Sequence, residues 1–162
     1  MYINISYCSQ LIFLTNFSEI NLFIFTFTAI ITIDYMTWYE NLPDSCPPKG
    51  SITPSGESYY RLLESETPSE KDFISHRAKY PDKKFHVSEC QAMSISVFKD
   101  INSCKTIAKL PRFKDKPAHI ARLNLQPRDG VIANTPNTKN SDHYSWWRSS
   151  KFDIESVQLV DE

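Results

Sequence analysis

The chain changes composition abruptly at Met36, and this change limits which part of it can fold as a globular domain. Residues 1–35 contain no Lys, Arg, Gly or Pro, whereas eight of them are Ile and five are Phe. All ten prolines, all three glycines and all 18 basic residues follow Met36. We therefore expect a single globular domain over residues 36–162, a length typical of one domain.

Residues 1–35 match neither a signal peptide nor a typical membrane-spanning helix. Their only charges are Glu19 and Asp34, whereas a signal peptide begins with a positive region. The longest uncharged apolar run, 20–33, has 14 residues, and a spanning helix needs about 20. Their composition is typical of AT-rich non-coding DNA translated in error. We predict that the natural protein starts at Met36; a disordered or hydrophobic segment, a membrane anchor and a buried strand are the alternatives.

The overall composition suits a globular protein. Hydrophobic residues make up 41% of the chain and aromatic residues 13%, which excludes wholesale disorder. A net charge of −1 gives the whole molecule no preference for nucleic acid or for an acidic surface. The four cysteines, Cys8, Cys46, Cys90 and Cys104, show no C-x-x-C spacing. We therefore expect reduced thiols in a cytoplasmic protein.

Capping signals predict two or three helices after Met36. The T-x-x-E motif at 67–70 is a capping box with Pro at the first helical position, which predicts a helix over 67–80. Residues 88–91 predict a second, short helix. Asp100 is the expected N-cap of a helix over 101–110. The expected inner face of that helix consists of Ile101, Cys104, Ile107, Ala108 and Leu110.

Alternation of apolar and polar residues predicts four to six short strands. The strand candidates are residues 58–64, 94–98, 117–125, 131–133 and 152–160. Strands and helices interleave along the chain. The sequence therefore predicts one compact α+β domain with a mixed or antiparallel sheet.

The segment "SDHYSWWR" is the first candidate for a binding site. Neighbouring residues of a strand point to opposite faces, so only Trp146 or Trp147 can face a core if this segment is extended. The other indole, beside Tyr144 and Arg148, would then form a binding surface for a partner protein. The alternative is a loop closed by two large apolar side chains. His143 is a candidate catalytic acid or base.

Arg61, within "YYRLL", is the second candidate. An arginine flanked by apolar residues on a central strand needs a partner, because burying it unpaired is costly. That partner is either a ligand phosphate or an internal carboxylate such as Glu64 or Asp72.

Residues 99–128 form a basic tract with a net charge of +6. Its cations are Lys99, Lys105, Lys109, Arg112, Lys114, Lys116, Arg122 and Arg128. Such a tract can bind nucleic acid or phosphates, and the alternative is a solvated helix face followed by a loop.

Metal-ligating residue types are present but scattered. They are His86, Cys90, Cys104, His119 and His143. Only His86 and Cys90 have the i, i+4 spacing that brings two ligands together on a helix, so we predict no metal site.

The order of elements from Arg61 onward resembles the ADP-ribosyltransferase-like fold, especially its smaller RES-type members. "YYRLL" resembles the early strand of that group, "SISVFKD" with the helix after it resembles the second element, and "AHIARLNLQPRDGVI" resembles the third. The resemblance implies that NAD is bound, that Arg61 contacts a pyrophosphate or the nicotinamide amide, and that Ser94 or Ser96 supports the ribose. No E-x-E motif is present. Glu155, expected on a strand, is the late candidate for the catalytic acid.

Taken together, these features predict a small accessory or interaction module that binds a partner protein. An NAD-using enzyme of the ADP-ribosyltransferase-like group is the alternative. Nucleic-acid binding through residues 99–128 is the second alternative.

Overall fold

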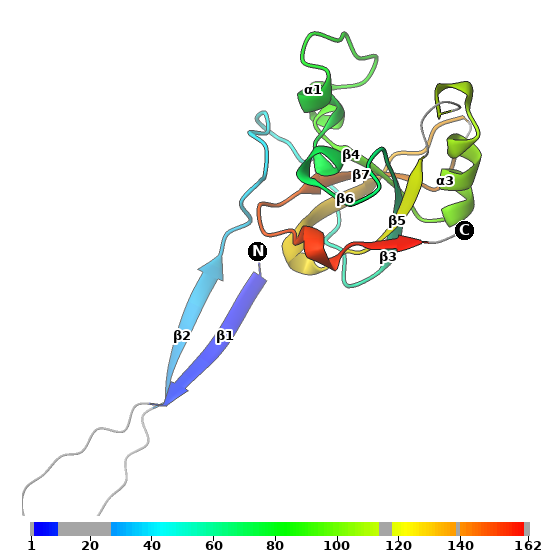
Figure 1. Ribbon diagram of the computed structural model, residues 1–162. Helices are drawn as coiled ribbons and strands as arrows, with labels where there is room; N and C mark the ends of the chain where they lie inside the picture. Colours follow the sequence, from blue (N-terminus) through cyan, green and yellow to red (C-terminus); the bar gives the residue numbers. More distant parts are fainter. Residues whose placement is uncertain (1, 10–26, 114–117, 139, 161–162) are drawn as a thin grey trace, which may run out of the picture. The chain divides into compact units, whose positions relative to one another are not determined.

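The chain divides into two units, Met1–Met36 and Thr37–Glu162 (Figure 1). The structure is a computed structural model that describes residues 2–9, 27–113, 118–138 and 140–160. In the first unit β1 (Tyr2–Ser9) pairs antiparallel with β2 (Phe27–Asp34). At least half of the residues in each strand are β-branched or aromatic, which favours extended backbone. That the natural protein starts at Met36 stays a prediction.

Among the described residues of the second unit, six strands form one open antiparallel sheet (Figure 1). The strand order is β6-β7-β4-β3-β5-β8. The strand bounds are Ser58–Leu63 for β3, Ile95–Phe98 for β4, His119–Asn124 for β5, Gly130–Asn134 for β6, His143–Arg148 for β7 and Gln158–Val160 for β8. Together with three α-helices, this sheet confirms the predicted α+β class.

The three α-helices are short, and each begins at a capping side chain. They are α1 (His76–Lys79), α2 (Glu89–Ala92) and α3 (Ile101–Ala108). Their N-caps are Ser75, Ser88 and Asp100, so the predicted caps at the last two positions are confirmed. Four 3-10 turns complete the described part: η1 (Glu70–Phe73), η2 (Pro111–Phe113), η3 (Pro127–Asp129) and η4 (Ile154–Ser156).

The predicted continuous helix over 67–80 is wrong, because helical structure is interrupted at Ile74 and Ser75. The backbone N–H of Ser75 donates to one carboxylate oxygen of Glu40 at 2.7 Å, and its hydroxyl donates to the other at 2.6 Å. That N–H is therefore not available for a helical bond. The upstream part becomes the separate turn η1, which is capped by Ser69.

Both faces of the sheet are covered by apolar side chains. The larger cluster includes Phe73, Trp146 and Phe152, and the smaller one joins Phe98 and Ile120 to Cys104 of α3. A strand covered on both faces buries consecutive residues.

Both tryptophans of β7 are buried as a result, with exposed fractions of 0% for Trp146 and 2% for Trp147. The prediction that one of them is partly exposed is wrong. Trp146 packs edge-on against Phe152, with ring centroids 4.8 Å apart. On the other face, the Trp147 indole N–H donates to the carbonyl of Cys90 at 2.9 Å.

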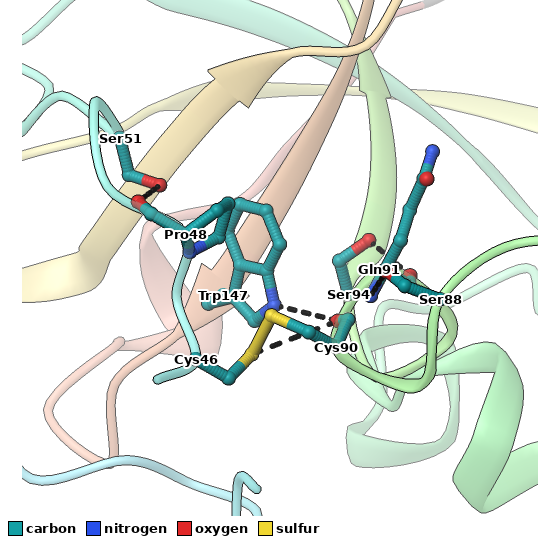
Figure 2. The surroundings of a disulfide bond; sticks show 8 residues. All are labelled: Cys46, Pro48, Ser51, Ser88, Cys90, Gln91, Ser94 and Trp147. Atoms are coloured by element: carbon teal, nitrogen blue, oxygen red, sulfur yellow. Dashed lines mark hydrogen bonds between the residues drawn. A yellow bond between two sulfur atoms is a disulfide. The ribbon is translucent and has the colours of Figure 1, made fainter. Parts of the chain in front are cut away.

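A disulfide joins Cys46, in the proline-rich segment before β3, to Cys90 of α2 (Figure 2). The expectation of reduced thiols is wrong for this pair. The two cysteines are 44 positions apart, so no local spacing reveals the bond. Cys104 is a free, buried thiol.

Two predicted positions near element ends are also wrong. Leu110 is 44% exposed, because α3 ends at Ala108 and Leu110 no longer lies on its inner face. The predicted strand over 152–160 is shorter, because an Asp153-capped turn, η4, precedes β8. Glu155 therefore lies exposed on a turn and not on a strand.

Candidate functional site

Arg61 lies where the two central strands of the sheet separate. β3 pairs with β5 at six positions but with β4 only at Tyr60 and Phe98. Beyond that pair, Arg61 Nε donates to the carbonyl of Asp72 and Nη1 donates to the carbonyl of Ser96, both at 2.7 Å. The guanidinium thus takes the place of ladder hydrogen bonds between β3 and β4.

The partners of Arg61 are internal, as one of the two sequence alternatives has it, but Asp72 contributes its carbonyl and not its carboxylate. The Asp72 carboxylate instead accepts from Ser69 and from the backbone N–H of Glu64. Burial lowers the pKa of Arg61 to about 10, against the opposing effect of the Asp72 charge. Arg61 therefore stays charged at neutral pH in a poorly solvated position.

Ser96 and His143 form a hydrogen-bonded pair on the same face of the sheet. His143 Nε2 lies 3.0 Å from Ser96 Oγ, and Nδ1 lies 2.9 Å from both the carbonyl oxygen and the hydroxyl oxygen of Thr135. Because the carbonyl can only accept, this contact favours the neutral tautomer with the proton on Nδ1, in which Nε2 accepts from the serine hydroxyl. Burial lowers the pKa of His143, which favours this neutral form. A hydroxyl, a neutral imidazole and an orienting acceptor are the parts of a base-activated nucleophile.

Three of the sequence-predicted site residues are therefore linked through Ser96: Arg61 donates to its main-chain carbonyl, and His143 bonds to its hydroxyl. Ser94 does not join them, since it is buried and its hydroxyl donates to the carbonyl of Gln91 at 2.8 Å. Glu155 is exposed on η4, outside the sheet.

Arg148, the last residue of β7, lies in a second polar cluster. Its side chain is 4% exposed, and it donates to both carboxylate oxygens of Glu70, from Nη1 at 2.6 Å and from Nη2 at 3.1 Å. Its guanidinium lies 4.0 Å from the ring centre of Tyr39. The hydrogen bonds from Arg148 are the main cause of the lowered pKa of Glu70. A small hollow beside this cluster is lined by Tyr39, Glu40, Leu42, Met93, Ile95 and Arg148.

The four residues predicted as a binding surface are thus mostly inside the fold. Trp146, Trp147 and Arg148 are buried. Tyr144 is half-buried and packs edge-on against Tyr59, with ring centroids 5.5 Å apart. β7 is an internal strand of the sheet, and its buried side chains contact other segments of the fold.

The basic tract is distributed over α3, β5 and η3. Lys114, Lys116 and the side chain of Arg112 lie outside the described residues. Lys105 is exposed on α3, and Arg122 of β5 donates to the side chain of Gln158. Among the remaining described cations, the ammonium of Lys99 lies over the ring of Tyr59, and Lys109 is exposed. Arg128 Nε lies 3.8 Å from a carboxylate oxygen of Asp129.

Residues 80–87, between α1 and α2, form an exposed loop that sequence reasoning missed. Its apolar members Tyr80 and Val87 are 46% and 45% exposed, which is high for large apolar side chains. The guanidinium of Arg77, on α1, donates hydrogen bonds to two backbone carbonyls of this loop. The only sequence signal was Pro81, which marks the end of a helix but gives no information on the conformation of the residues after it.

Metal-binding clusters and membrane-spanning helices are both absent from the part of the chain that the structure describes. Its residues include no group of three or more His, Cys, Asp or Glu side chains arranged to bind a metal ion. None of its helices is long and apolar enough to cross a membrane.

In the comparisons with known proteins, no family model, curated protein or solved structure matched the chain. The resemblance to the ADP-ribosyltransferase-like group therefore stays a prediction.

Proposed function

We propose that the unit Thr37–Glu162 is an accessory module that acts by binding a partner protein. The observation that carries this proposal is the set of large apolar side chains left on its surface. These are Tyr39, Ile52, Tyr80, Val87, Leu110 and Leu159. Apolar anchors of this kind supply much of the binding energy at protein interfaces.

The polar residues expected to do chemistry support the same proposal by being engaged inside the fold. Arg61 bonds to two backbone carbonyls, and Ser94 bonds to the carbonyl of Gln91. Arg148 bonds to Glu70. Residues with such partners stabilise the fold, whereas a catalytic group needs a free approach to its substrate.

Site-specific photo-crosslinking of the full chain, in the cells that naturally make it, tests this proposal. A p-benzoylphenylalanine residue replaces Tyr39, Ile52, Val87, Leu110 or Leu159, one at a time. We expect a discrete covalent adduct with one protein at one or two neighbouring positions. The same residue at Thr138, an exposed polar position, measures the background. Absence of a discrete adduct at all five positions would overturn the proposal.

A second candidate function, an NAD-using enzyme, is favoured by one observation: His143 bonds to the Ser96 hydroxyl, and Arg61 donates to the main-chain carbonyl of the same serine. Purified protein incubated with NAD would then release nicotinamide and melt at a higher temperature. The Ser96→Ala variant, which removes one hydroxyl, would lose the turnover. Unchanged NAD and an unchanged melting temperature would remove this candidate.

We include a cytoplasmic location in the proposal, but the Cys46–Cys90 disulfide is evidence against that location and makes it testable. Disulfides persist mainly in oxidising compartments. Protein taken from its source cells under alkylating conditions is analysed by mass spectrometry. Alkylation of both cysteines supports the cytoplasm, and protection of both against alkylation contradicts it.

A further inference from the structure

The exposed loop 80–87 extends beyond α1 and away from the sheet (Figure 1). Tyr80 and Val87, at its two ends, are each nearly half exposed, and Phe85 between them is partly exposed. The other members of the loop are exposed polar or charged residues and Pro81. A single loop thus presents apolar anchors and charges together.

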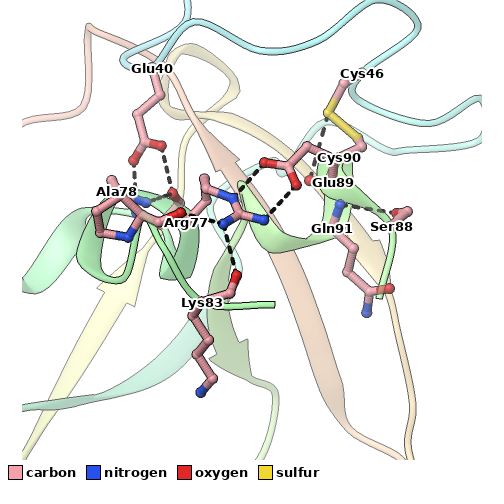
Figure 3. Close-up of polar contacts among 11 residues, drawn as sticks. Glu40, Cys46, Arg77, Ala78, Lys83, Ser88, Glu89, Cys90 and Gln91 are labelled. Carbon is pink, nitrogen blue, oxygen red and sulfur yellow. Dashed lines mark hydrogen bonds and ion pairs between the residues drawn. A yellow bond between two sulfur atoms is a disulfide. The ribbon is translucent and has the colours of Figure 1, made fainter. Parts of the chain in front are cut away.

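Arg77 holds this loop in one conformation (Figure 3). Its Nη1 donates to the carbonyl of Pro81 at 2.8 Å and to the carbonyl of Lys83 at 2.9 Å. Its Nε and Nη2 donate to the two carboxylate oxygens of Glu89 at 2.6 and 2.7 Å. Glu89 lies next to Cys90, which the disulfide ties to Cys46. A loop fixed in this way loses little conformational entropy when a partner binds.

The charge that the loop offers to a partner is positive. Arg77 and Lys79 are neutralised by Glu89 and Glu64. Lys83 and Lys84 form no ion pair within the part of the chain that the structure describes, and Asp82 is the loop's one acidic residue.

Lys83 also lies among aromatic rings, with Nζ 5.4 Å from the ring centre of Tyr80 and 5.5 Å from that of Phe85. The positive charge of Lys83 therefore lies beside two aromatic rings of the loop. An acidic partner would meet complementary charge at the rim of an apolar contact.

We propose that loop 80–87 is the docking surface of this protein and that its occupant is an acidic protein segment with an apolar side chain to cover Tyr80 and Val87. This inference rests on the proposed function and names the partner class for it. Nucleic acid is the less favoured occupant, because the loop offers only two cations without an ion pair among the described residues, whereas tight phosphate binding uses many.

The test uses the full chain with the photo-crosslinker at Val87, which leaves Tyr80 and both lysines intact. We expect an adduct at this position, and we expect mass spectrometry to show that the attached partner segment is acidic. The double variant Lys83→Glu/Lys84→Glu should lower the adduct yield about tenfold. The matched control is Lys105→Glu/Lys109→Glu, on α3 and at its C-cap, which makes the same charge change elsewhere and should leave the yield unchanged. Circular dichroism and the melting temperature verify that each variant is folded.

A second pair of variants tests the apolar part of the surface. Tyr80→Ala should lower the adduct yield at Val87, whereas Leu110→Ala, at a position with nearly the same exposed fraction, should not. Equal yields in these two variants would contradict a role for Tyr80 as an anchor.

The remaining outcomes separate this inference from the proposed function. Adducts at Tyr39, Ile52, Leu110 or Leu159 but not at Val87 would overturn the loop as docking surface and leave the binding function standing. A non-acidic attached segment, or an adduct removed by nuclease, would overturn the acidic protein partner. Absence of adducts at every position would overturn both.

Discussion

Two arginine-centred regions of the sheet hold the same turn, η1, but they do so in different ways. In the Arg61 region, the guanidinium bonds to backbone carbonyls, one of which belongs to Asp72 of η1. In the Arg148 region, the guanidinium bonds to the carboxylate of Glu70, the first residue of η1, and to the carbonyl of Phe73. One turn is therefore fastened to β3 by one arginine and to β7 by the other.

The difference shows what each region can contribute. Arg61 has carbonyl partners and a pKa lowered by burial, so its charge is poorly compensated. Arg148 has a carboxylate partner and aromatic neighbours, with its guanidinium 4.0 Å from the ring centre of Tyr39 and 5.2 Å from that of Phe152. We infer that the Arg148 region contributes more to stability. The Arg61 region, with the Ser96–His143 pair beside it, has more of the groups that a catalytic site would need.

The largest expected effect is that of Arg148→Ala. This change removes a buried side chain from beside Tyr39 and Phe152 and breaks the bonds to Glu70. Because Glu70 is 55% exposed, the ion pair itself accounts for only about 1 kcal/mol, and lost packing accounts for most of the effect. We expect the free energy of unfolding, measured by urea denaturation, to fall by about 3 kcal/mol. A fall smaller than the one caused by Arg61→Ala would reverse the ranking of the two regions.

The next effect is that of Arg61→Met, which keeps much of the volume but leaves the carbonyls of Asp72 and Ser96 without this donor. Unpaired buried acceptors cost about 1–3 kcal/mol, so we expect a loss of about 2 kcal/mol. Arg61→Lys should lose less, about 1 kcal/mol, because an ammonium can still reach one carbonyl. Urea denaturation of both variants measures this. Equal losses for Met and Lys would contradict the expectation that an ammonium recovers one of the hydrogen bonds of Arg61.

The sequence predicts several strands and helix starts around these regions, but neither the turn η1 nor β7. Alternation locates β4 and β5, and Ser88 and Asp100 locate the starts of α2 and α3, because these signals act within a few residues. The sequence also predicts that Arg61 needs a partner and that Ser96 and His143 are polar residues worth testing.

What the sequence misses is the contacts between segments far apart in the chain. The bonds from Ser75 to Glu40 span 35 positions, and those from Arg148 to Glu70 span 78. The disulfide partner of Cys46 is 44 positions away. Such contacts depend on how the strands are ordered in the sheet, which no local pattern encodes. For the same reason, burial of both Trp146 and Trp147 was not predictable, since it requires that both sheet faces be covered.

A smaller effect distinguishes the two regions by pH. Burial lowers the pKa of His143 in the folded state, so below its ordinary value of 6.5 the unfolded chain takes up a proton that the folded protein does not. The free energy of unfolding should therefore fall as the pH is lowered from about 7 to about 5. His143→Gln, which cannot titrate, should reduce this dependence. An identical pH dependence in the variant would contradict a buried, neutral His143.

The smallest effect belongs to the Arg148 region and lies at lower pH. Hydrogen bonds from Arg148 lower the pKa of Glu70 below its ordinary value of 4.5. The carboxylate therefore contributes stability that is fully present above the pKa of the unfolded chain and is lost as the pH falls through the folded-state pKa. Glu70→Gln should be less stable than the natural protein at pH 7, by no more than about 1 kcal/mol because the side chain is half exposed.

The stability difference between Glu70→Gln and the natural protein should shrink as the pH falls below 4.5 and disappear once the pH is below the lowered folded-state pKa of Glu70. Urea denaturation of both proteins over a series of pH values from about 7 to about 2 measures it. A difference that persists at the lowest pH would mean that Glu70 acts through packing and not through its charge. The Arg148 region would then be held, like the Arg61 region, without a useful ion pair.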